Sequence, residues 1–238
     1  MDNLAAGLAS LKTWSAVARG TIALFLLVQV ILIIANLWLL YAELTVGGGN
    51  LMVWGATTGV STVSAYGRIF ALLLGGSVLL LGLFFLLGVI PIALWIYRAH
   101  ANLREAGVTE LGYSPGWSVG SFFVPLVNVV IPFRAMRQLH NRSHGENELE
   151  ANSPVGDVTS WWSCHVAAMA VLVVATSVAA LATVPNLYVV QPPGVNTGMF
   201  VFALLLLTGS ANYLFRTIGA ITRAQQDRMH LNRAEVFA

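Results

Sequence analysis

Charged residues are scarce in this chain. Only 9% of its 238 residues are Asp, Glu, Lys or Arg, whereas soluble domains carry about 25%. A soluble protein of this size needs a charged surface, and a chain that is 57% hydrophobic has too few charges to make one. The composition therefore excludes a water-soluble enzyme and a disordered chain. It indicates an integral membrane protein.

Cysteine and lysine are almost absent, with one residue of each type, Cys164 and Lys12. A single cysteine excludes an internal disulfide and a cysteine-based zinc site. All other basic side chains are arginines, a bias that fits a GC-rich bacterial genome. The net charge of +2 is too small to predict a nucleic-acid partner.

Four segments are apolar over the roughly 20 residues that a helix needs to cross a bilayer. They are residues 22–41, 69–97, 161–184 and 199–215. A fifth apolar run, residues 122–132, is too short to cross and is interrupted by Pro125. Its length predicts a re-entrant or interfacial element over residues 115–132. The expected fold is an all-α integral membrane protein with four transmembrane helices.

The positions of the basic residues predict the orientation, because cytoplasmic loops carry an excess of Lys and Arg. The loop over residues 42–67 has no Lys or Arg, and the loop over residues 185–198 has no charge. Eleven of the twelve basic residues lie on the opposite side, and Arg68 is the exception. Both termini and residues 98–160 and 216–238 are therefore expected in the cytoplasm. The protein is expected in the inner membrane of a bacterial cell.

The N-terminal residues 1–19 have apolar side chains at helical spacing, among them Leu4, Leu8 and Leu11, with Lys12 beside them. This pattern predicts an amphipathic helix that lies on the inner membrane surface. A helix packed on the cytoplasmic part of the same protein fits the pattern equally well. A weaker amphipathic pattern follows the fourth span. Residues 20–238 are expected to form one membrane domain.

None of the four spans contains Asp or Glu. This absence counts against ion-coupled transport, which usually requires an ionisable side chain at membrane depth. The spans do contain polar side chains, namely Asn36, Ser77, Thr208, Ser210 and Asn212. Hydrogen bonds between helices are the simplest role for these side chains, and a polar-lined conduit is the alternative.

The most distinctive residues lie between the second and third spans. An aromatic-Arg pair precedes an Asn-Leu pair, then a Ser-Pro-Gly-Trp turn follows, and then a run ends in Pro-Phe-Arg-Ala-Met. These residues are Arg98, Asn102, Leu103, Ser114, Pro115, Gly116, Trp117, Gly120, Phe123, Pro125, Asn128, Pro132, Phe133, Arg134, Ala135 and Met136. The chain resembles the DUF4328 family in this pattern, and the resemblance extends over roughly residues 69–229. It implies a multi-span bacterial membrane protein and supplies no activity.

The candidate binding residues lie on the expected cytoplasmic side. Four arginines there are suited to hold an anionic group such as a lipid phosphate, although anchoring at the membrane surface explains them equally. The predicted site for an anionic lipid or a partner consists of Arg98, Asn102, Arg104, Trp117, Asn128, Arg134 and Arg137.

No catalytic residue, cofactor or metal site is predicted. His140 and His144 are four residues apart, a spacing that metal ligands use, but Gly145 is expected to end their helix. No known enzyme motif is present. The leading hypothesis is a non-enzymatic membrane protein whose cytoplasmic side binds a protein partner or an anionic lipid. The alternatives are an oligomeric channel lined by Asn128 or Asn212, with the segment over residues 115–132 as its pore loop, and a lipid-modifying enzyme of an unfamiliar type.

Overall fold

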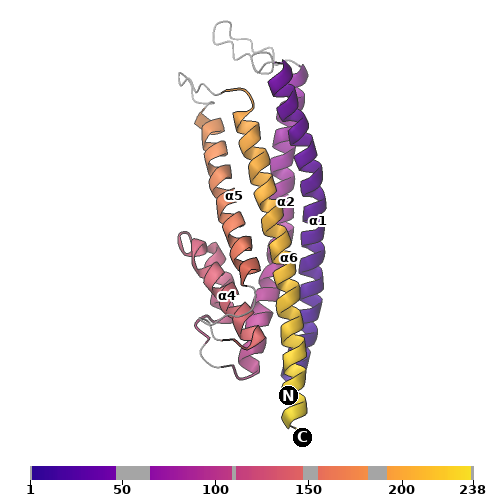
Figure 1. Cartoon of the computed structure of the whole chain (residues 1–238), viewed down its shortest axis with the longest axis vertical. Coiled ribbons are helices and arrows are strands. Elements are labelled where there is room, and N and C mark those ends of the chain that lie inside the picture. Colours follow the sequence, from indigo (N-terminus) through magenta and orange to yellow (C-terminus); the bar gives the residue numbers. More distant parts are fainter. Residues whose placement is uncertain (1, 47–64, 109–110, 147–154, 182–191, 237–238) are drawn as a thin grey trace. The chain divides into compact units, whose positions relative to one another are not determined.

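The computed structural model describes residues 2–46, 65–108, 111–146, 155–181 and 192–236. All the regular structure in these ranges is helical (Figure 1). The long helices are α1 (Asp2–Val46), α2 (Ala65–Glu105), α5 (Gly156–Leu181) and α6 (Val195–Val236). Between α2 and α5 lie α3 (Pro115–Gly120), the short 3-10 turns η1 (Ser121–Phe123) and η2 (Val127–Val129), and α4 (Ile131–His144). The expectation of an all-α fold is confirmed.

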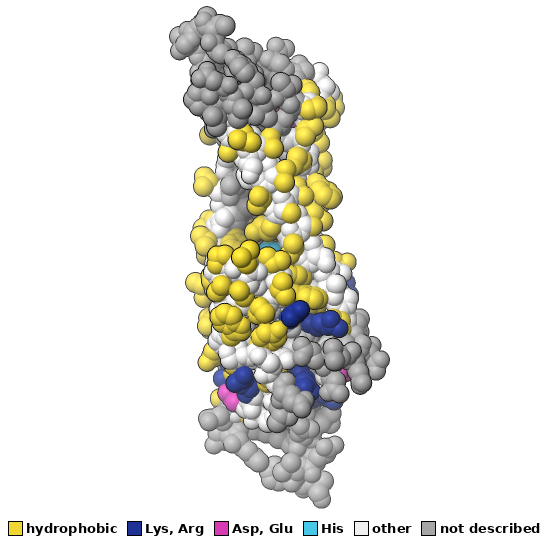
Figure 2. Space-filling model, turned by 90° about the vertical axis from the view of Figure 1, so that its left-hand side faces the viewer, with side chains coloured by type: hydrophobic (Ala, Val, Ile, Leu, Met, Phe, Trp, Pro, Cys, Tyr) yellow, Lys and Arg dark blue, Asp and Glu magenta, His cyan; other side chains and the backbone are white. Residues whose placement is uncertain are grey.

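In the described part of the chain, four helices are long and apolar enough to cross a membrane, one in each of α1, α2, α5 and α6. This finding confirms the prediction of four spanning helices. Broad areas of one face are covered by hydrophobic side chains, as Figure 2 shows. Such a surface suits lipid rather than water. Most of the two loops predicted outside the cytoplasm falls in residues 47–64 and 182–191, which lie outside the described residues.

The chain divides into two compact units. One consists of residues 1–25, 85–163 and 209–238 and is called the polar unit below. The other consists of residues 26–84 and 164–208 and is called the apolar unit.

The apolar unit is built from α1, α2, α5 and α6. Its core cluster consists of Leu32, Phe200 and Leu204, against which Leu172 of α5 packs. At the start of α6, Gly194 has a positive φ of 79° and lies against Leu40 and Leu44 of α1. The end of α1 therefore contacts the beginning of α6, and the two helices run antiparallel in this unit.

The polar unit has a core of large apolar side chains that includes Leu11, Trp95 and Ile218, all without exposed surface. Trp95 Nε1 donates a hydrogen bond to Thr222 Oγ1 at 3.0 Å, which joins α2 to α6. Arg19 of α1 lies over the Phe215 ring of α6, with 4.2 Å between its guanidinium carbon and the ring centroid. The beginning of α1 thus packs on α2 and α6 of the same unit.

Of the two interpretations of residues 1–19, the structure supports the one in which this segment packs on other helices of the same protein. Residues 1–19 do not form a helix of their own, because α1 continues without a break from Asp2 to Val46. Gly20, the first residue of the predicted membrane domain, lies inside α1, and a single glycine costs a helix only about 1 kcal/mol. Placement of this segment on a membrane surface stays a prediction.

Two glycines end helices, and the sequence predicts this for Gly145. Gly107 follows α2 with φ 79°, and Gly145 follows α4 with φ 74°. Left-handed backbone is inexpensive only for glycine, and both residues donate to carbonyls of the preceding turn, Gly107 to Arg104 and Gly145 to Arg142. The helix α2 continues beyond the second predicted span, residues 69–97, and ends at Glu105, with Pro91 inside it.

Candidate functional site

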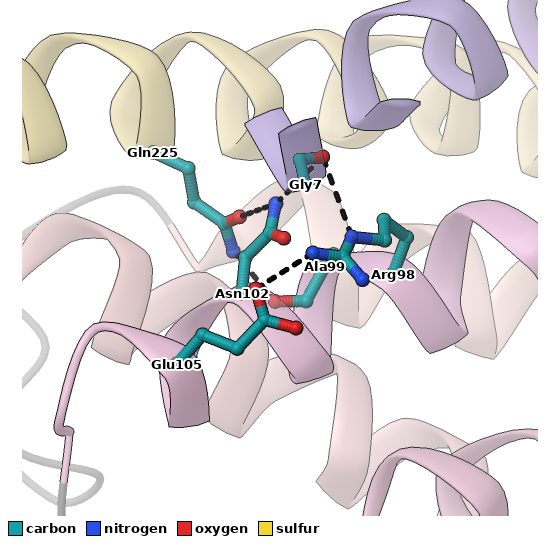
Figure 3. A network of polar contacts seen from close by, with 6 residues as sticks. All are labelled: Gly7, Arg98, Ala99, Asn102, Glu105 and Gln225. Carbon is teal, nitrogen blue, oxygen red and sulfur yellow. Dashed lines mark hydrogen bonds and ion pairs between the residues drawn. The ribbon is translucent and has the colours of Figure 1, made fainter. Parts of the chain in front are cut away.

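A network of polar contacts in the polar unit joins α1, α2 and α6 (Figure 3). Asn102 of α2 has no exposed surface. Its Nδ2 donates to the carbonyl oxygen of Gly7 at 3.4 Å and to Gln225 Oε1 at 3.5 Å. The Nε of Arg98 donates to the same Gly7 carbonyl at 3.4 Å, and its guanidinium forms an ion pair with Glu105 at 2.7 Å. The network holds the N-terminal end of α1 on α2.

Gln225 extends this network from α6 to α4. Its Nε2 donates to the carbonyl of Ala99 at 3.0 Å and to Ser143 Oγ at 2.9 Å. The side chain is 1% exposed, so these hydrogen bonds form away from water, where a lost bond leaves a costly unsatisfied group. The Gln225 amide therefore joins three helices of the polar unit, α2, α4 and α6.

A side chain at position 7 would displace its neighbours. A Cβ placed there would overlap the Arg98 guanidinium and the Asn102 amide. The absence of a side chain lets α1 approach α2 closely enough for its carbonyl to accept both hydrogen bonds.

Three of the predicted binding residues thus have partners within the protein. Arg98 and Asn102 bind the N-terminal segment, and the exposed Arg104 donates to the carbonyl of Tyr113 at 3.3 Å. A structural role accounts for each of them. Their contact with a lipid or partner stays a prediction.

Residues 115–132, called the bent segment below, follow this network in the chain. Ser114 caps α3 by accepting a hydrogen bond from the Trp117 N–H at 3.1 Å, and Pro115 begins the helix. The helical pieces on either side of the turn over residues 124–126 differ in direction by 111°. Leu126 lies at this turn with φ 65°, a left-handed conformation that is costly for a branched side chain.

The turn of the bent segment presents apolar side chains outward. Leu126 is 87% exposed, Phe123 67% and Val129 50%. Asn128 is also exposed, so its amide does not cap the segment from inside. Trp117 is 45% exposed on α3. A cluster of exposed apolar side chains on one turn marks an interaction surface.

The backbone of this turn is hydrogen-bonded despite its irregular shape. Val127 donates to the carbonyl of Pro125 at 2.8 Å, and Asn128 donates to the carbonyl of Val124 at 2.9 Å. Trp162 at the start of α5 donates its Nε1 to the carbonyl of Val129 at 2.8 Å. Its ring also meets Phe122 edge to face at 6.3 Å between centroids. The turn thus supplies partners for much of its own backbone.

Arginines follow the bent segment on α4, which packs against α3. Arg134 is exposed, and Arg137, three residues later, is partly buried. The Nε of Arg137 is buried and has no hydrogen-bond partner among the described residues. The opposite face of α4 is buried through Met136 and Leu139. The two guanidinium groups and the first turn of α4 present positive charge beside an apolar tip.

At the other end of α4, the rings of His140 and His144 stack with 4.4 Å between centroids. His144 Nδ1 lies 2.8 Å from the His140 carbonyl oxygen. Burial and, to a smaller extent, the neighbouring His144 lower the pKa of His140. No group of three His, Cys, Asp or Glu side chains among the described residues is placed to share a metal ion.

Comparison with known families gives a match to this chain. The model of the family described as "Domain of unknown function (DUF4328)" matches residues 62–223, more than half of the chain. The chain belongs to the DUF4328 family. The match to DUF4328 confirms the resemblance that the sequence indicates, and it contains the whole bent segment and α4. No curated protein and no solved structure matches the chain.

Outside the DUF4328 match, sequence reasoning assigned no role to two residues of the network. Gly7 and Gln225 complete the polar network but lie outside the matched residues. A signal for Gln225 is present in the sequence, because it continues the buried face of α6 that Ile218 and Ile221 form at helical spacing. A glutamine on such a face predicts a buried hydrogen-bonding role. Nothing in the sequence singles out Gly7.

Proposed function

We propose that the polar unit faces the cytoplasm and binds anionic phospholipid at the inner surface of the membrane. The bent segment enters the inner leaflet and returns to the same side, so that it is a re-entrant element. The distribution of the basic residues supports this orientation. The protein is a non-enzymatic, multi-pass protein of a bacterial inner membrane in this proposal.

The observation that carries the proposal is the exposed apolar turn whose backbone is hydrogen-bonded. Burial of a side chain such as Leu126 or Phe123 in hydrocarbon stabilises by about 1.5–3 kcal/mol each. Such a gain is lost if backbone N–H groups enter lipid without partners. The hydrogen bonds of Val127 and Asn128 remove part of that penalty. The turn is therefore suited to lipid.

The charged groups beside the turn are suited to lipid headgroups. Trp117 is the side-chain type that favours the interface between hydrocarbon and water. Arg134 lies in the first turn of α4. The planar guanidinium group of an arginine binds phosphate with two parallel hydrogen bonds. Arg137 adds a second guanidinium with a buried Nε. Trp117 precedes the apolar turn in the chain and the two arginines follow it, so both ends of the turn carry side chains that favour the membrane surface.

The proposal is tested by measuring lipid that remains with the purified protein. Wild type and the Arg134→Gln, Arg137→Gln double variant are exchanged into detergent with a fixed mixture of phosphatidylglycerol and phosphatidylcholine. Each basic residue at a membrane surface contributes about 1 kcal/mol of attraction to anionic lipid. Loss of both is therefore expected to lower the enrichment of phosphatidylglycerol by about 10- to 30-fold.

Arg223→Gln is the matched control, because Arg223 is an exposed arginine of α6 in the same unit. Its variant is expected to keep the wild-type enrichment. Equal enrichment in the double variant and the wild type would refute lipid binding by α4 and would leave a protein as the partner of this surface.

A further inference from the structure

The apolar unit contains an amide that its packing does not explain. Gln29 lies in the middle of the apolar stretch of α1 and has no exposed surface. Neither its Oε1 nor its Nε2 has a hydrogen-bond partner among the described residues. Burial of a polar group without a partner costs about 1–3 kcal/mol in proteins. A leucine at this position would avoid that cost.

Gln29 belongs to a column of polar side chains on one face of α1. Asn36 and Glu43 follow at intervals of seven residues, and seven residues are close to two turns of a helix. Asn36 has no exposed surface and donates its Nδ2 to the Leu32 carbonyl at 2.7 Å. The column from Gln29 to Glu43 is about 21 Å long at 1.5 Å per residue, which is about two thirds of the roughly 30 Å hydrocarbon layer.

The outer end of the column contains a carboxylate. Glu43 accepts a hydrogen bond from Thr197 in the first turn of α6, and Thr197 is 2% exposed. The Oε2 of Glu43 is buried without a partner in the part of the chain that the structure describes. The sequence prediction of acid-free spans remains correct for residues 22–41, but α1 continues beyond them and carries Glu43 on the same face.

Two further polar residues of the apolar unit, His165 and Thr208, lie on the neighbouring helices α5 and α6. The core cluster places Leu32 of α1, Leu172 of α5 and Leu204 of α6 together. His165 precedes Leu172 by seven residues, and Thr208 follows Leu204 by four. Because α6 runs antiparallel to α1 and α5, both residues fall on the same side of the cluster as Gln29. A titratable ring at this depth is a functional signal by default.

Helix packing alone is the competing explanation for the column. A buried polar residue in a helix seam fixes register by binding a partner on the facing helix. Glu43 fits this role through its hydrogen bond with Thr197 of α6, whereas the Asn36 hydrogen bond to the Leu32 carbonyl stays within α1. Gln29 does not, since neither of its amide atoms has a partner among the described residues.

We infer that this column is a pathway for protons through the apolar unit. Amide groups donate and accept hydrogen bonds to water without changing their own charge, so Gln29 and Asn36 can order a chain of water molecules. The Glu43 carboxylate accepts a proton from water and releases it again, and the His165 imidazole does the same at the other end. No bond other than those to the moving proton changes. The charge carried by the proton requires a compensating ion flux.

The test measures proton flux in liposomes that contain the full-length protein. The vesicles hold a pH-sensitive dye and potassium, and valinomycin supplies the compensating potassium flux. Wild-type protein is expected to acidify or alkalinise the interior faster than protein-free vesicles under an imposed potential. Gln29→Leu and Glu43→Gln are each expected to reduce this flux at least tenfold.

Thr176→Val is the matched control. Thr176 is exposed on α5, and its hydroxyl donates to the Leu172 carbonyl of its own helix at 2.7 Å. This variant removes a hydroxyl outside the column and is expected to keep flux within twofold of wild type. Gln29→Glu retains the size and polarity of the side chain and is expected to conduct, which separates loss of the pathway from loss of packing.

The absence of flux above protein-free vesicles would overturn the inference, and so would undiminished flux in Gln29→Leu and Glu43→Gln. If Gln29→Leu fails to fold, the flux through Glu43→Gln decides the question alone. This variant replaces one carboxylate oxygen by an amide nitrogen and keeps the shape of the side chain. Proton flux is measured independently of lipid enrichment by α4. The proton pathway and the lipid site can therefore fail separately.

Discussion

Replacement of Gly7 by alanine tests the contact that holds the N-terminal end of α1 on the polar unit. In an ordinary helix this change stabilises by about 0.5–1 kcal/mol. Here the added Cβ overlaps the Arg98 guanidinium and the Asn102 amide. Both side chains must move, and both hydrogen bonds to the Gly7 carbonyl at 3.4 Å are lost.

The magnitude follows from these two bonds. A hydrogen bond from a charged donor contributes about 1.5–3 kcal/mol and one from a neutral donor about 0.5–1.5 kcal/mol. Both bonds are long, so the lower values apply, and their sum of about 2 kcal/mol exceeds the helix gain. We expect a net loss of about 1–1.5 kcal/mol, which makes the N-terminal segment open about 5- to 12-fold more often.

Amide hydrogen exchange of peptides covering residues 4–14 measures this opening directly. Gly20→Ala on the same helix is the control, since a Cβ at Gly20 has no atom within 4 Å, and it is expected to slow exchange. Protection of residues 4–14 that is unchanged or increased in Gly7→Ala would show that the Gly7 carbonyl is not held by α2.

The remaining predictions concern two buried side chains of the polar unit. Gln225→Leu removes the amide that lies 3.0 Å from the Ala99 carbonyl and 2.9 Å from the Ser143 hydroxyl. Thermal unfolding should therefore show that the free energy of unfolding falls by about 2–4 kcal/mol. A fall of less than about 0.5 kcal/mol would contradict the importance of this amide. Burial lowers the pKa of His140, so the unfolded chain binds more protons and stability should fall as pH drops through and below about 6.5. The drop between pH 7 and pH 5 should be smaller in His140→Asn, and an equal drop in both proteins would contradict this assignment.

Much of the architecture could be predicted because its causes are local. Apolar length alone identifies the four spanning helices. Gly107 and Gly145 end their helices with a positive φ, a backbone conformation that glycine adopts at little cost. The break in the bent segment likewise follows from Pro125 and from an apolar run shorter than a bilayer.

The candidate sites were harder to predict because their causes lie far apart in the chain. Arg98 and Asn102 are suited to bind an anion when read alone, but Gly7, over 90 residues earlier, takes both donors. Gln29 is one polar residue within a long apolar stretch, and its burial depends on the packing of α5 and α6 around Leu32. Only tertiary structure distinguishes such a residue from one that faces lipid.

The path of the bent segment decides whether α4 meets the lipid headgroups as proposed. Single cysteines at Glu110 and Glu148, introduced into a Cys164→Ala background, are labelled from each side of oriented vesicles with a reagent that does not cross the membrane. We predict that both react only from the cytoplasmic side, and that a probe at Leu126 is quenched by a quencher dissolved in lipid. Reaction of the two cysteines from opposite sides would show a fifth crossing and would contradict the account.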